Sequence, residues 1–475
     1  MIFAEIRPYP WPFKAALSIS NDCDFLTLDA MLALHRLFQT SADAGGFGLE
    51  LSDSFFFYKT ASKWPNYSYF EGLSKAETKA APLIRTLVGK GYLDTTHALG
   101  DFESGGFRRE LARIAVDNFA SHGLKLPVWS NHGGYGNRQN IGRRDFCYYH
   151  GGDDFHGPHY ILDLIEELGV RYIWTDVSKS KWMSLQPRGP VATERERKAP
   201  RALWMWPRRQ TLETYVPVWN YDRREVFETI ETRVGSKLQG FIRYDGFLPD
   251  GDCGVDKKRL ITPDGRRVGP NIGRLAISLT SDKLDKLVKE QACVFLYQHL
   301  STLAHLPDRT HLTRDLEFHP ENVESLKSLK KREEQGEIWV AAQAILLDYL
   351  YMLNTVEVQI DRSSTDTVAL QLRIMKGYEY RGCSGLTVEI GNHPVQSHLM
   401  GPDGRIIPCH TVGPDERGVY FAHVPIRRLP GIDWRALAAE HGVAMNDRLT
   451  ISELDGSRAV DLFMPDQKYA GKRLI

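Results

Sequence analysis

Short apolar runs that end in a carboxylate or an imidazole recur between Ala15 and His299. Stretches with apolar residues at helical spacing, such as Leu28 to Phe38, separate these runs. Strands that alternate with helices pair in parallel, so the groups at their carboxyl ends meet at one edge of the sheet. The residues that end or follow the runs are Asp22, Asp24, His97, His132, Asp176 and His299.

The pattern predicts about seven strands with helical crossovers, which is typical of a barrel. After Tyr351 the period of the apolar residues changes to two, as in Thr355 to Ile360. Alternation of apolar and polar residues between short turns predicts antiparallel strands. We therefore expect an α/β fold with two domains. These are a distorted (β/α)7 barrel over residues 1–352 and a small antiparallel β-sandwich over residues 353–475.

The bulk composition argues against several classes of protein. The formal net charge of the 475 residues is zero, so nothing predicts general binding to nucleic acid or to a membrane surface. The six cysteines are scattered without a Cys-x-x-Cys pair, and we expect reduced thiols. The N-terminus lacks a signal-peptide pattern, and the most apolar later stretch, Trp339 to Leu353, is interrupted by Gln343 and Asp348. We expect a cytoplasmic protein without a membrane span.

Asp22 and Asp24 lie two residues apart at the end of the first strand. Their side chains would point the same way if the strand continued. Two carboxylates this close repel each other unless a cation or a shared proton relieves them. The pair therefore favours a metal ion on one carboxylate, with the other left as a base. The alternative is an N-cap for the next helix, because Asp is a favoured capping residue.

His97 and His132 are candidate metal ligands at two later strand ends. Asp101 follows His97 by four residues, which is ligand spacing if that segment turns helical. His132 opens the run Gly133 to Gly136, where glycines let backbone N–H groups approach a ligand closely. Each imidazole alone also suits a structural histidine or a solvated turn. The sequence has no Gly-x-Ser-x-Gly elbow, which disfavours serine hydrolysis.

The segment from Ser178 to Gln210 is strongly basic and carries three tryptophans. Indole rings stack on sugars, and Arg binds phosphate or carboxylate through two hydrogen bonds. The segment predicts an anionic sugar substrate, or else a solvated loop anchored by its tryptophans. His299 follows another apolar run and is either a proton donor or a polar cap of a core strand. The residues that we expect to contact substrate are Trp174, Asp176, Arg208 and Arg209.

The order of the first two motifs resembles that of the polysaccharide deacetylase family. The family's first motif has a base Asp and a metal Asp after the first strand, which is similar to Asp22 and Asp24. Its second motif has two histidines four residues apart. Here His97 matches the first of them, and Asp101 stands in the second place.

Two later motifs extend this resemblance over about residues 12 to 350. The family has an Arg-x-Pro-Tyr-Gly loop, which is similar to His132 to Gly136 with His in place of Arg. Its last motif is a strand that ends in Leu-x-His, which is similar to Leu296 to His299 with one more residue between. On these motifs the chain is identified as an atypical member.

The resemblance implies a hydrolase that uses a divalent metal, most simply zinc, to remove an N-acetyl or O-acetyl group from a sugar. It implies that Asp24 and His97 hold the metal. The third ligand is either Asp101 or His132, and we expect His132.

The resemblance also implies the roles of three groups around the metal. Asp22 takes a proton from water, the backbone N–H of Tyr135 stabilises the oxyanion, and His299 protonates the departing amine. One rival hypothesis is a non-catalytic glycan-binding protein on a decayed barrel. Another is a glycoside hydrolase on a related barrel, with Asp22 and Asp176 as its carboxylates.

Overall fold

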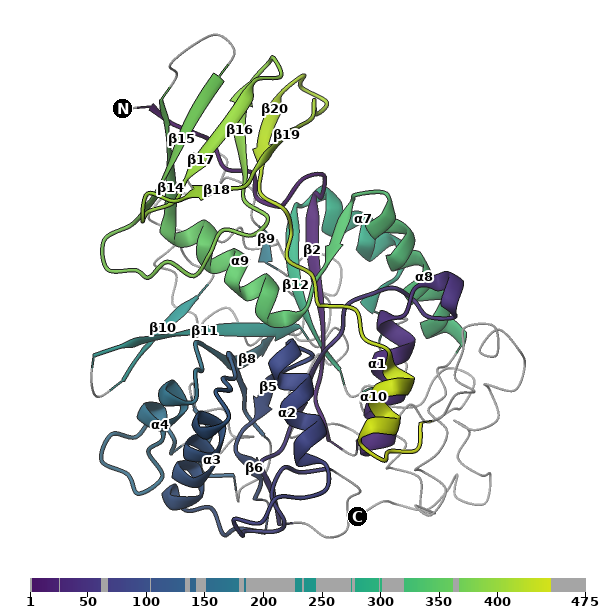
Figure 1. Cartoon of the computed structure of the whole chain (residues 1–475), viewed down its shortest axis with the longest axis vertical. Helices are drawn as coiled ribbons and strands as arrows, with labels where there is room; N and C mark the ends of the chain where they lie inside the picture. The colour runs from purple at the N-terminus through teal and green to yellow at the C-terminus, as the bar shows by residue number, and fades with distance from the viewer. Residues whose placement is uncertain are drawn as a thin grey trace, which may run out of the picture.

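The structure is a computed structural model with a mixed α/β fold around one mostly parallel sheet, accompanied by several smaller sheets (Figure 1). The main sheet has ten strands. The structure describes residues 2–24, 26–60, 67–102, 104–132, 137–141, 151–178, 183–184, 227–232, 235–244, 275, 278–298, 300, 320–361 and 367–445.

The central strands of the main sheet are neighbours in nearly the order in which the chain makes them. β2, β3, β5, β7, β8 and β11 follow one another in parallel, and β12 and β13 both pair in parallel with β2. β11 also pairs with β12 in parallel, through Tyr244 and Leu296. The strands are β2 (Ala15–Asn21), β3 (Ser52–Phe55), β5 (Leu93–His97), β7 (Val128–Ser130), β8 (Tyr172–Ser178), β9 (Met183–Ser184), β10 (Glu228–Glu231), β11 (Lys237–Tyr244), β12 (Ala292–Gln298) and β13 (Ile338–Val340).

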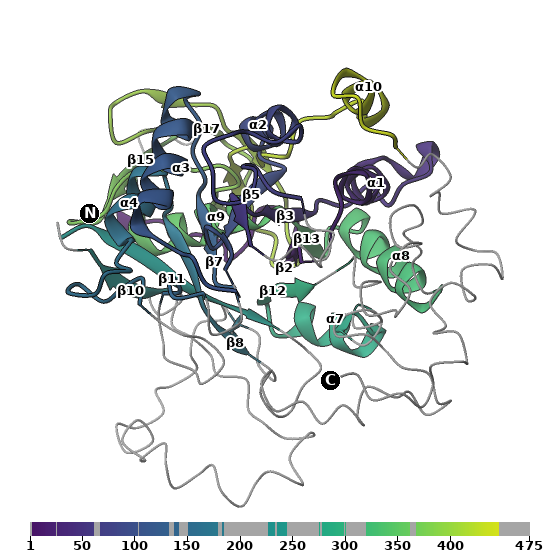
Figure 2. The same ribbon diagram turned by 90° about the horizontal axis from the view of Figure 1, so that it is seen from below.

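Helices lie around the outside of these strands in the view of Figure 2. Their ends follow the local sequence. In α2, for example, Pro82 lies in the first turn and Gly91 closes the helix in the left-handed conformation that glycine tolerates, at φ 84°. The helices are α1 (Leu28–Gln39), the 3₁₀ turn η1 (Ala42–Ala44), α2 (Ala81–Lys90), α3 (Arg109–Ser121), α4 (Leu162–Glu167), α7 (Ser281–Lys289), α8 (Pro320–Glu334), α9 (Gln343–Thr355) and α10 (Trp434–Glu440).

The smaller sheets are made mainly by the part of the chain that follows α9. One has the order β1-β14-β15-β17-β18, a second has the order β16-β20-β19, and β4 pairs with β6. Their bounds are β1 (Ile2–Phe3), β4 (Tyr58–Lys59), β6 (Gly100–Asp101), β14 (Val356–Asp361), β15 (Thr367–Ile374), β16 (Thr387–Gly391), β17 (Gln396–Met400), β18 (Ile406–Ile407), β19 (His410–Val412) and β20 (Tyr420–His423).

The expected period of two is visible in β15, where Val368, Leu370 and Leu372 are buried between less buried neighbours. The pairing departs from the antiparallel expectation in one place, because β15 and β17 run parallel. The intervening strand β16 belongs to the other small sheet, so the chain crosses over before β17 returns in the same direction.

Elements near the two ends of the described residues each contact elements that are distant in sequence. β1 pairs with β14, and Trp434 of α10 stacks on His35 of α1 with ring centroids 5.5 Å apart. The proposed boundary near residue 353 stays a prediction. The sequence also predicts a strand from Thr214 to Trp219, and this segment lies outside the described residues. None of the helices in the described ranges is both long and apolar enough to cross a bilayer.

Candidate metal centre

The carboxyl ends of neighbouring strands bring three of the predicted segments together. β2 leads directly into Asp22 and Asp24, β5 ends at His97, and β7 is followed by Asn131 and His132. Only β3 separates β2 from β5, and β5 pairs directly with β7. Because these strands are parallel, their carboxyl ends lie at one edge of the main sheet, where α/β proteins commonly bind ligands.

Asp24, His97 and His132 form a group that could hold a metal ion. One ligand atom of each residue lies within 4.8 Å of the others. The Asp24 Oδ1 atom is 3.0 Å from His132 Nε2 and 3.7 Å from His97 Nδ1. Two ligands of a tetrahedral zinc ion, at bond lengths of about 2.0–2.2 Å, lie roughly 3.3 Å apart, so these separations suit an ion held between the three side chains. Asp101, the other possible third ligand, is not a member of this group.

Aromatic packing holds the two imidazoles of the group in place. His97 and His132 are only 1% and 6% exposed. Phe56, directly after β3, stacks on the His97 ring with centroids 5.1 Å apart and meets the His132 ring edge-on at 5.2 Å. The ring planes are therefore set before any ion binds, which lowers the cost of ordering the ligands.

The hydrogen bond of His97 suits a metal ligand. Its Nε2 atom is 3.1 Å from the Asn131 carbonyl oxygen, which can only accept, so Nε2 carries a proton and donates it. Nδ1 then faces Asp24 with its lone pair. Metal-binding histidines commonly donate their other N–H to a carbonyl or a carboxylate in this way.

The hydrogen bonds of His132, unlike those of His97, do not suit a metal ligand. The Phe102 N–H donates to Asn137 Oδ1 at 2.8 Å, so the Asn137 amide nitrogen points at His132 Nδ1, also at 2.8 Å. His132 Nδ1 therefore accepts, and Nε2 carries the proton and donates it to Asp24 Oδ1. An ion on Nε2 would require that this proton leave and that the Asn137 amide turn.

Asp22 is buried behind this group. Its Oδ2 atom is 3.6 Å from His97 Nε2, the ring nitrogen that does not face Asp24. Its Oδ1 atom accepts a hydrogen bond from Arg243 Nη1 at 2.9 Å, and the same nitrogen also reaches Ser130 Oγ at 3.0 Å. Because Asp22 and Arg243 are both fully buried, this ion pair compensates each charge for its lost hydration.

Arg243 connects the carboxyl edge to the interior of the sheet. Its Nε donates to Gln343 Oε1 at 3.1 Å, and the Gln343 amide donates to Thr95 Oγ1 at 3.0 Å. Its guanidinium lies 5.0 Å from the centre of the Trp174 ring, which stacks on Tyr297 with centroids 5.2 Å apart. The buried Trp174 ring is thus packed against Arg243 and Tyr297, and its expected contact with a sugar stays a prediction.

Cys23, between the two aspartates, is a further buried group beside the centre. Its Sγ atom is 3.8 Å from His97 Nδ1. Burial and the charge of Asp24 raise the pKa of this thiol well above its ordinary value, so it remains protonated at neutral pH. Cys23 is not a member of the Asp24, His97 and His132 group.

The other predicted site residues are placed as follows. Asp101 ends β6 and is buried, and Asp176 lies in β8, where it pairs with Ile242. Four predicted residues lie outside the described part of the chain: Tyr135, Arg208, Arg209 and His299.

Sequence reasoning missed the groups that support the ligands. Arg243 interrupts an apolar strand, and this isolated charge was the available signal for a buried ion pair. Phe56 follows β3, a strand whose Ser-Asp-Ser sequence does not look like a buried strand. Asn131 and Asn137 lie in or beside a turn, where asparagine is common for local reasons, so nothing marked them.

No protein-family model matches this sequence, and no curated protein or solved structure is significantly similar to it.

Proposed function

We propose that this protein is a metal-dependent hydrolase that removes an acetyl group, in the first place an N-acetyl group, from a sugar or glycan. The observation that carries the proposal is the Asp24, His97 and His132 group at the carboxyl edge of a parallel sheet. Asp24 and His97 stand at positions where the resemblance to polysaccharide deacetylases implies metal ligands, and His132 is the third ligand that we expect.

We extend the proposal to the architecture and to the ion. The main sheet would be a closed (β/α)7 barrel of the deacetylase type, and the pairing of β11 with β12 supports this closure. Two imidazoles and one carboxylate are ligands that zinc accepts, and a three-ligand site leaves a position for water or substrate. Zinc is therefore the ion that we propose.

Asp24, His97 and His132 would hold the ion, which when bound polarises the acetyl carbonyl and a water molecule. The Asn131 carbonyl orients His97 from behind. Phe56 holds both rings and keeps water from that side.

The remaining steps are assigned to three groups of the chain. Asp22 would accept a proton from the attacking water, and the Tyr135 N–H would face the developing oxyanion. His299 would give a proton to the departing amine, because an amide anion is too poor a leaving group. Arg243 keeps the Asp22 carboxylate in one orientation.

Asp22 could act as the general base or could orient His97, and the variant Asp22→Asn distinguishes these two roles. If Asp22 is the base, Asp22→Asn retains the metal and loses about 10²–10⁴-fold in kcat. If it orients His97, the same variant loses about 10–100-fold in metal affinity, and its kcat when saturated with metal changes little. Its distance of 3.6 Å from His97 Nε2 is compatible with the second role.

Metal analysis followed by an acetate-release screen tests the proposed function. The purified full chain should carry one divalent ion, and acetate release from acetylated oligosaccharides or nucleotide sugars should stop with a chelator and return with zinc. Asp24→Asn should lose both the ion and turnover. Asp101→Asn, a matched change of a buried carboxylate outside the group, should retain both. A chain without metal that releases no acetate would contradict the proposal.

One observation favours the non-catalytic alternative. The hydrogen bond from His132 to Asp24, fixed by Asn137, satisfies these side chains without an ion. A glycan-binding protein would bind an acetylated oligosaccharide equally well before and after treatment with a chelator, and it would release no acetate.

A further inference from the structure

A large cavity lies at the opposite edge of the main sheet from the metal centre. Its volume is about 1010 Å³. Its walls are the residues at the starts of β5, β8 and β11, the α9 helix, and the loop after β15. In Figure 1, α9 lies between the main sheet and the smaller sheets, so the cavity is at their junction.

The cavity is lined by more cations than carboxylates. The cations are Lys125, Arg171, Lys237, Lys376, Arg381 and Arg427, and the carboxylates are Asp94, Glu166, Asp348 and Glu379. Most of these carboxylates already accept hydrogen bonds from other side chains of the protein. Glu166 accepts from a serine hydroxyl at 2.6 Å, and Asp348 accepts from the Tyr172 hydroxyl at 2.8 Å and pairs with Arg171 at 3.1 Å.

Four of the cations have no such partner. The side chains of Lys125, Lys237, Lys376 and Arg427 make no ion pair or hydrogen bond with another residue of the described ranges. The lining therefore has a surplus of positive charge within reach of whatever enters the cavity.

Arg381 is the buried member of the cationic set. Its side chain is only 9% exposed, and its guanidinium carbon lies 3.8 Å from the centre of the Tyr351 ring. Its Nε atom is 3.9 Å from Glu379 Oε2, and its guanidinium carbon lies 5.5 Å from the centre of the Tyr172 ring. Its Nε and Nη1 atoms make no hydrogen bond with any described residue. Buried donors without acceptors are costly, so this guanidinium has unused hydrogen-bonding capacity beside the cavity.

We propose that this cavity binds a small molecule that carries a phosphate group and a ring. A phosphate dianion accepts two parallel hydrogen bonds from an arginine and attracts lysines as point charges. Arg381, Lys237 and Lys376 would take the phosphate. The Tyr378 ring, which is 47% exposed and belongs to the same wall, would contact the ring of the ligand.

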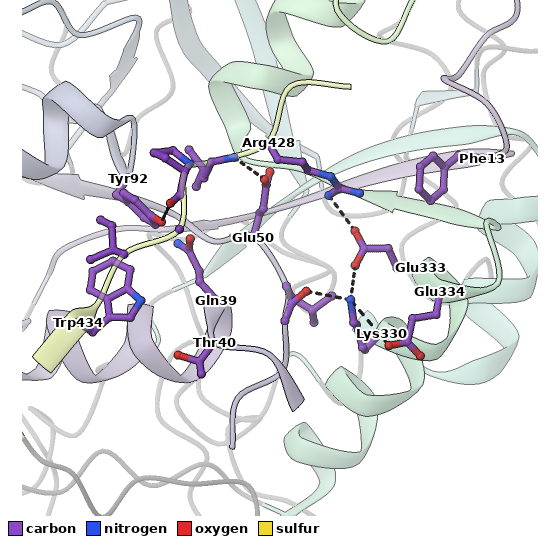
Figure 3. Close-up of a pocket in the computed structure, with 16 residues that line it drawn as sticks. Phe13, Gln39, Thr40, Glu50, Tyr92, Lys330, Glu333, Glu334, Arg428 and Trp434 are labelled. Atoms are coloured by element: carbon purple, nitrogen blue, oxygen red, sulfur yellow. Dashed lines mark hydrogen bonds and ion pairs between the residues drawn. The ribbon is translucent and has the colours of Figure 1, made fainter. Parts of the chain in front are cut away.

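A second cavity shows what a charged wall without a ligand role is like (Figure 3). Its volume is about 530 Å³, and its charged groups are paired with one another. Lys330 Nζ is 3.1 Å from Glu333 Oε2, Arg428 Nη1 is 2.9 Å from Glu333 Oε1, and Glu50 accepts from the Leu429 N–H at 2.8 Å. These contacts join the segment before α10 to α8 and to Glu50, which precedes β3, and this is a structural role.

Calorimetric titration of the full chain with glucose 6-phosphate, inorganic phosphate and glucose tests the site. We expect saturable binding of the sugar phosphate, weaker binding of phosphate and none of glucose. Arg381→Met should weaken binding about tenfold or more, since hydrogen bonds between charged groups are lost. The double variant Lys237→Ala, Lys376→Ala should weaken it less, because these side chains are more exposed to water.

Two controls locate the binding. Lys79→Ala, a change of an exposed lysine outside the cavity, should not alter the affinity. Asp24→Asn should not alter it either, because the metal centre is at the other edge of the sheet. The proposal is overturned if no saturable binding occurs, if Asp24→Asn removes it, or if the Lys237 and Lys376 double variant binds as tightly as the wild type. The double variant still tests binding in the cavity if Arg381→Met does not fold.

Discussion

Carboxylates lie at both edges of the main sheet, and their partners differ. At the amino-terminal edge, Glu50 accepts from the Ala342 N–H and Asp94 accepts from the Ala344 N–H, both at 2.8 Å, so the two carboxylates cap the first turn of α9. At the carboxyl edge, Asp24 faces two imidazoles instead. A backbone N–H has one fixed proton, whereas an imidazole can exchange its proton for a metal ion.

This difference separates the structural carboxylates from the proposed metal ligand. Burial raises the pKa of Glu50, and it raises the pKa of Asp94 to about 6 despite the hydrogen bonds to that carboxyl. Both groups nevertheless serve to hold a helix against the sheet, with the Gln343 N–H bound to Ser52 Oγ between them. The amino-terminal edge is therefore expected to control stability, and the carboxyl edge to control metal binding.

The largest effect is expected where the buried Asp22 carboxylate at the carboxyl edge loses the cation that pairs with it. Arg243→Met leaves the Asp22 carboxylate buried and unpaired, which should cost about 3–5 kcal/mol in the free energy of unfolding. Arg171→Met removes a pair with Asp348 that is partly exposed, and it should cost about 1 kcal/mol or less. Urea denaturation of both variants measures the difference. Equal costs would mean that Asp22 is not held as a buried charge.

A second test uses the titration of Asp94 at the amino-terminal edge. Its pKa in the folded state, about 6, is above the ordinary value of 3.8, so the folded state binds the proton more tightly. The contribution of this group to stability is therefore present below about pH 4 and is lost as the pH rises through 6. Relative to Asp94→Asn, the wild type should lose up to about 3 kcal/mol between pH 4 and pH 7.

Asp163 provides a control, because its contribution to stability should change with pH in the opposite direction to that of Asp94. Burial alone would raise the pKa of its carboxyl, but the Arg109 guanidinium outweighs burial and lowers it. The stability that Asp163 contributes is then present at neutral pH and is lost as the pH falls below its ordinary pKa. A difference between wild type and Asp94→Asn that does not vary with pH would show that Asp94 is accessible to water.

Much of this arrangement could be predicted from the sequence. Six apolar runs predicted β2, β5, β7, β8, β11 and β12. The runs are Ala15 to Ser20, Tyr92 to Thr96, Pro127 to Ser130, Arg171 to Thr175, Gly240 to Tyr244 and Cys293 to Tyr297. The rule that parallel strands end at one edge predicted that Asp24, His97 and His132 meet. Helix ends followed from residues such as Pro82 and Gly91.

The rest depended on contacts between distant segments. β3 was not predicted because Ser52, Asp53 and Ser54 are polar, and they are tolerated inside because distant groups such as Asp94 and the Cys23 N–H bond to them. The pairing of Arg243 with Asp22 joins residues 221 positions apart. Local patterns carry no information about such pairs.

Zinc should stabilise the protein by binding at the carboxyl edge of the main sheet and not at the amino-terminal edge. An ion that binds the folded state alone adds about 2.7 kcal/mol at a concentration of one hundred times its Kd, which raises Tm. Asp24→Asn should abolish this rise, and Asp94→Asn should leave it unchanged although it alters Tm without zinc. Thermal melts with and without zinc measure both. A rise of equal size in Asp24→Asn would place the ion elsewhere.

The smallest expected effect concerns the single feature that opposes a metal at the carboxyl edge. Asn137 receives the Phe102 N–H on its oxygen and so presents its amide nitrogen to His132. In Asn137→Asp the side chain keeps nearly the same shape, but its two oxygens can accept hydrogen bonds from both the Phe102 N–H and His132 Nδ1. His132 Nδ1 can then keep a proton, and Nε2 is free to bind the ion. Supporting groups of this kind change metal affinity by about tenfold or more, so zinc should bind about tenfold more tightly, or about 1.4 kcal/mol. Competition with a chromophoric chelator measures the change. Asp101→Asn should not alter the affinity, and weaker zinc binding in Asn137→Asp would show that His132 does not bind the ion through Nε2.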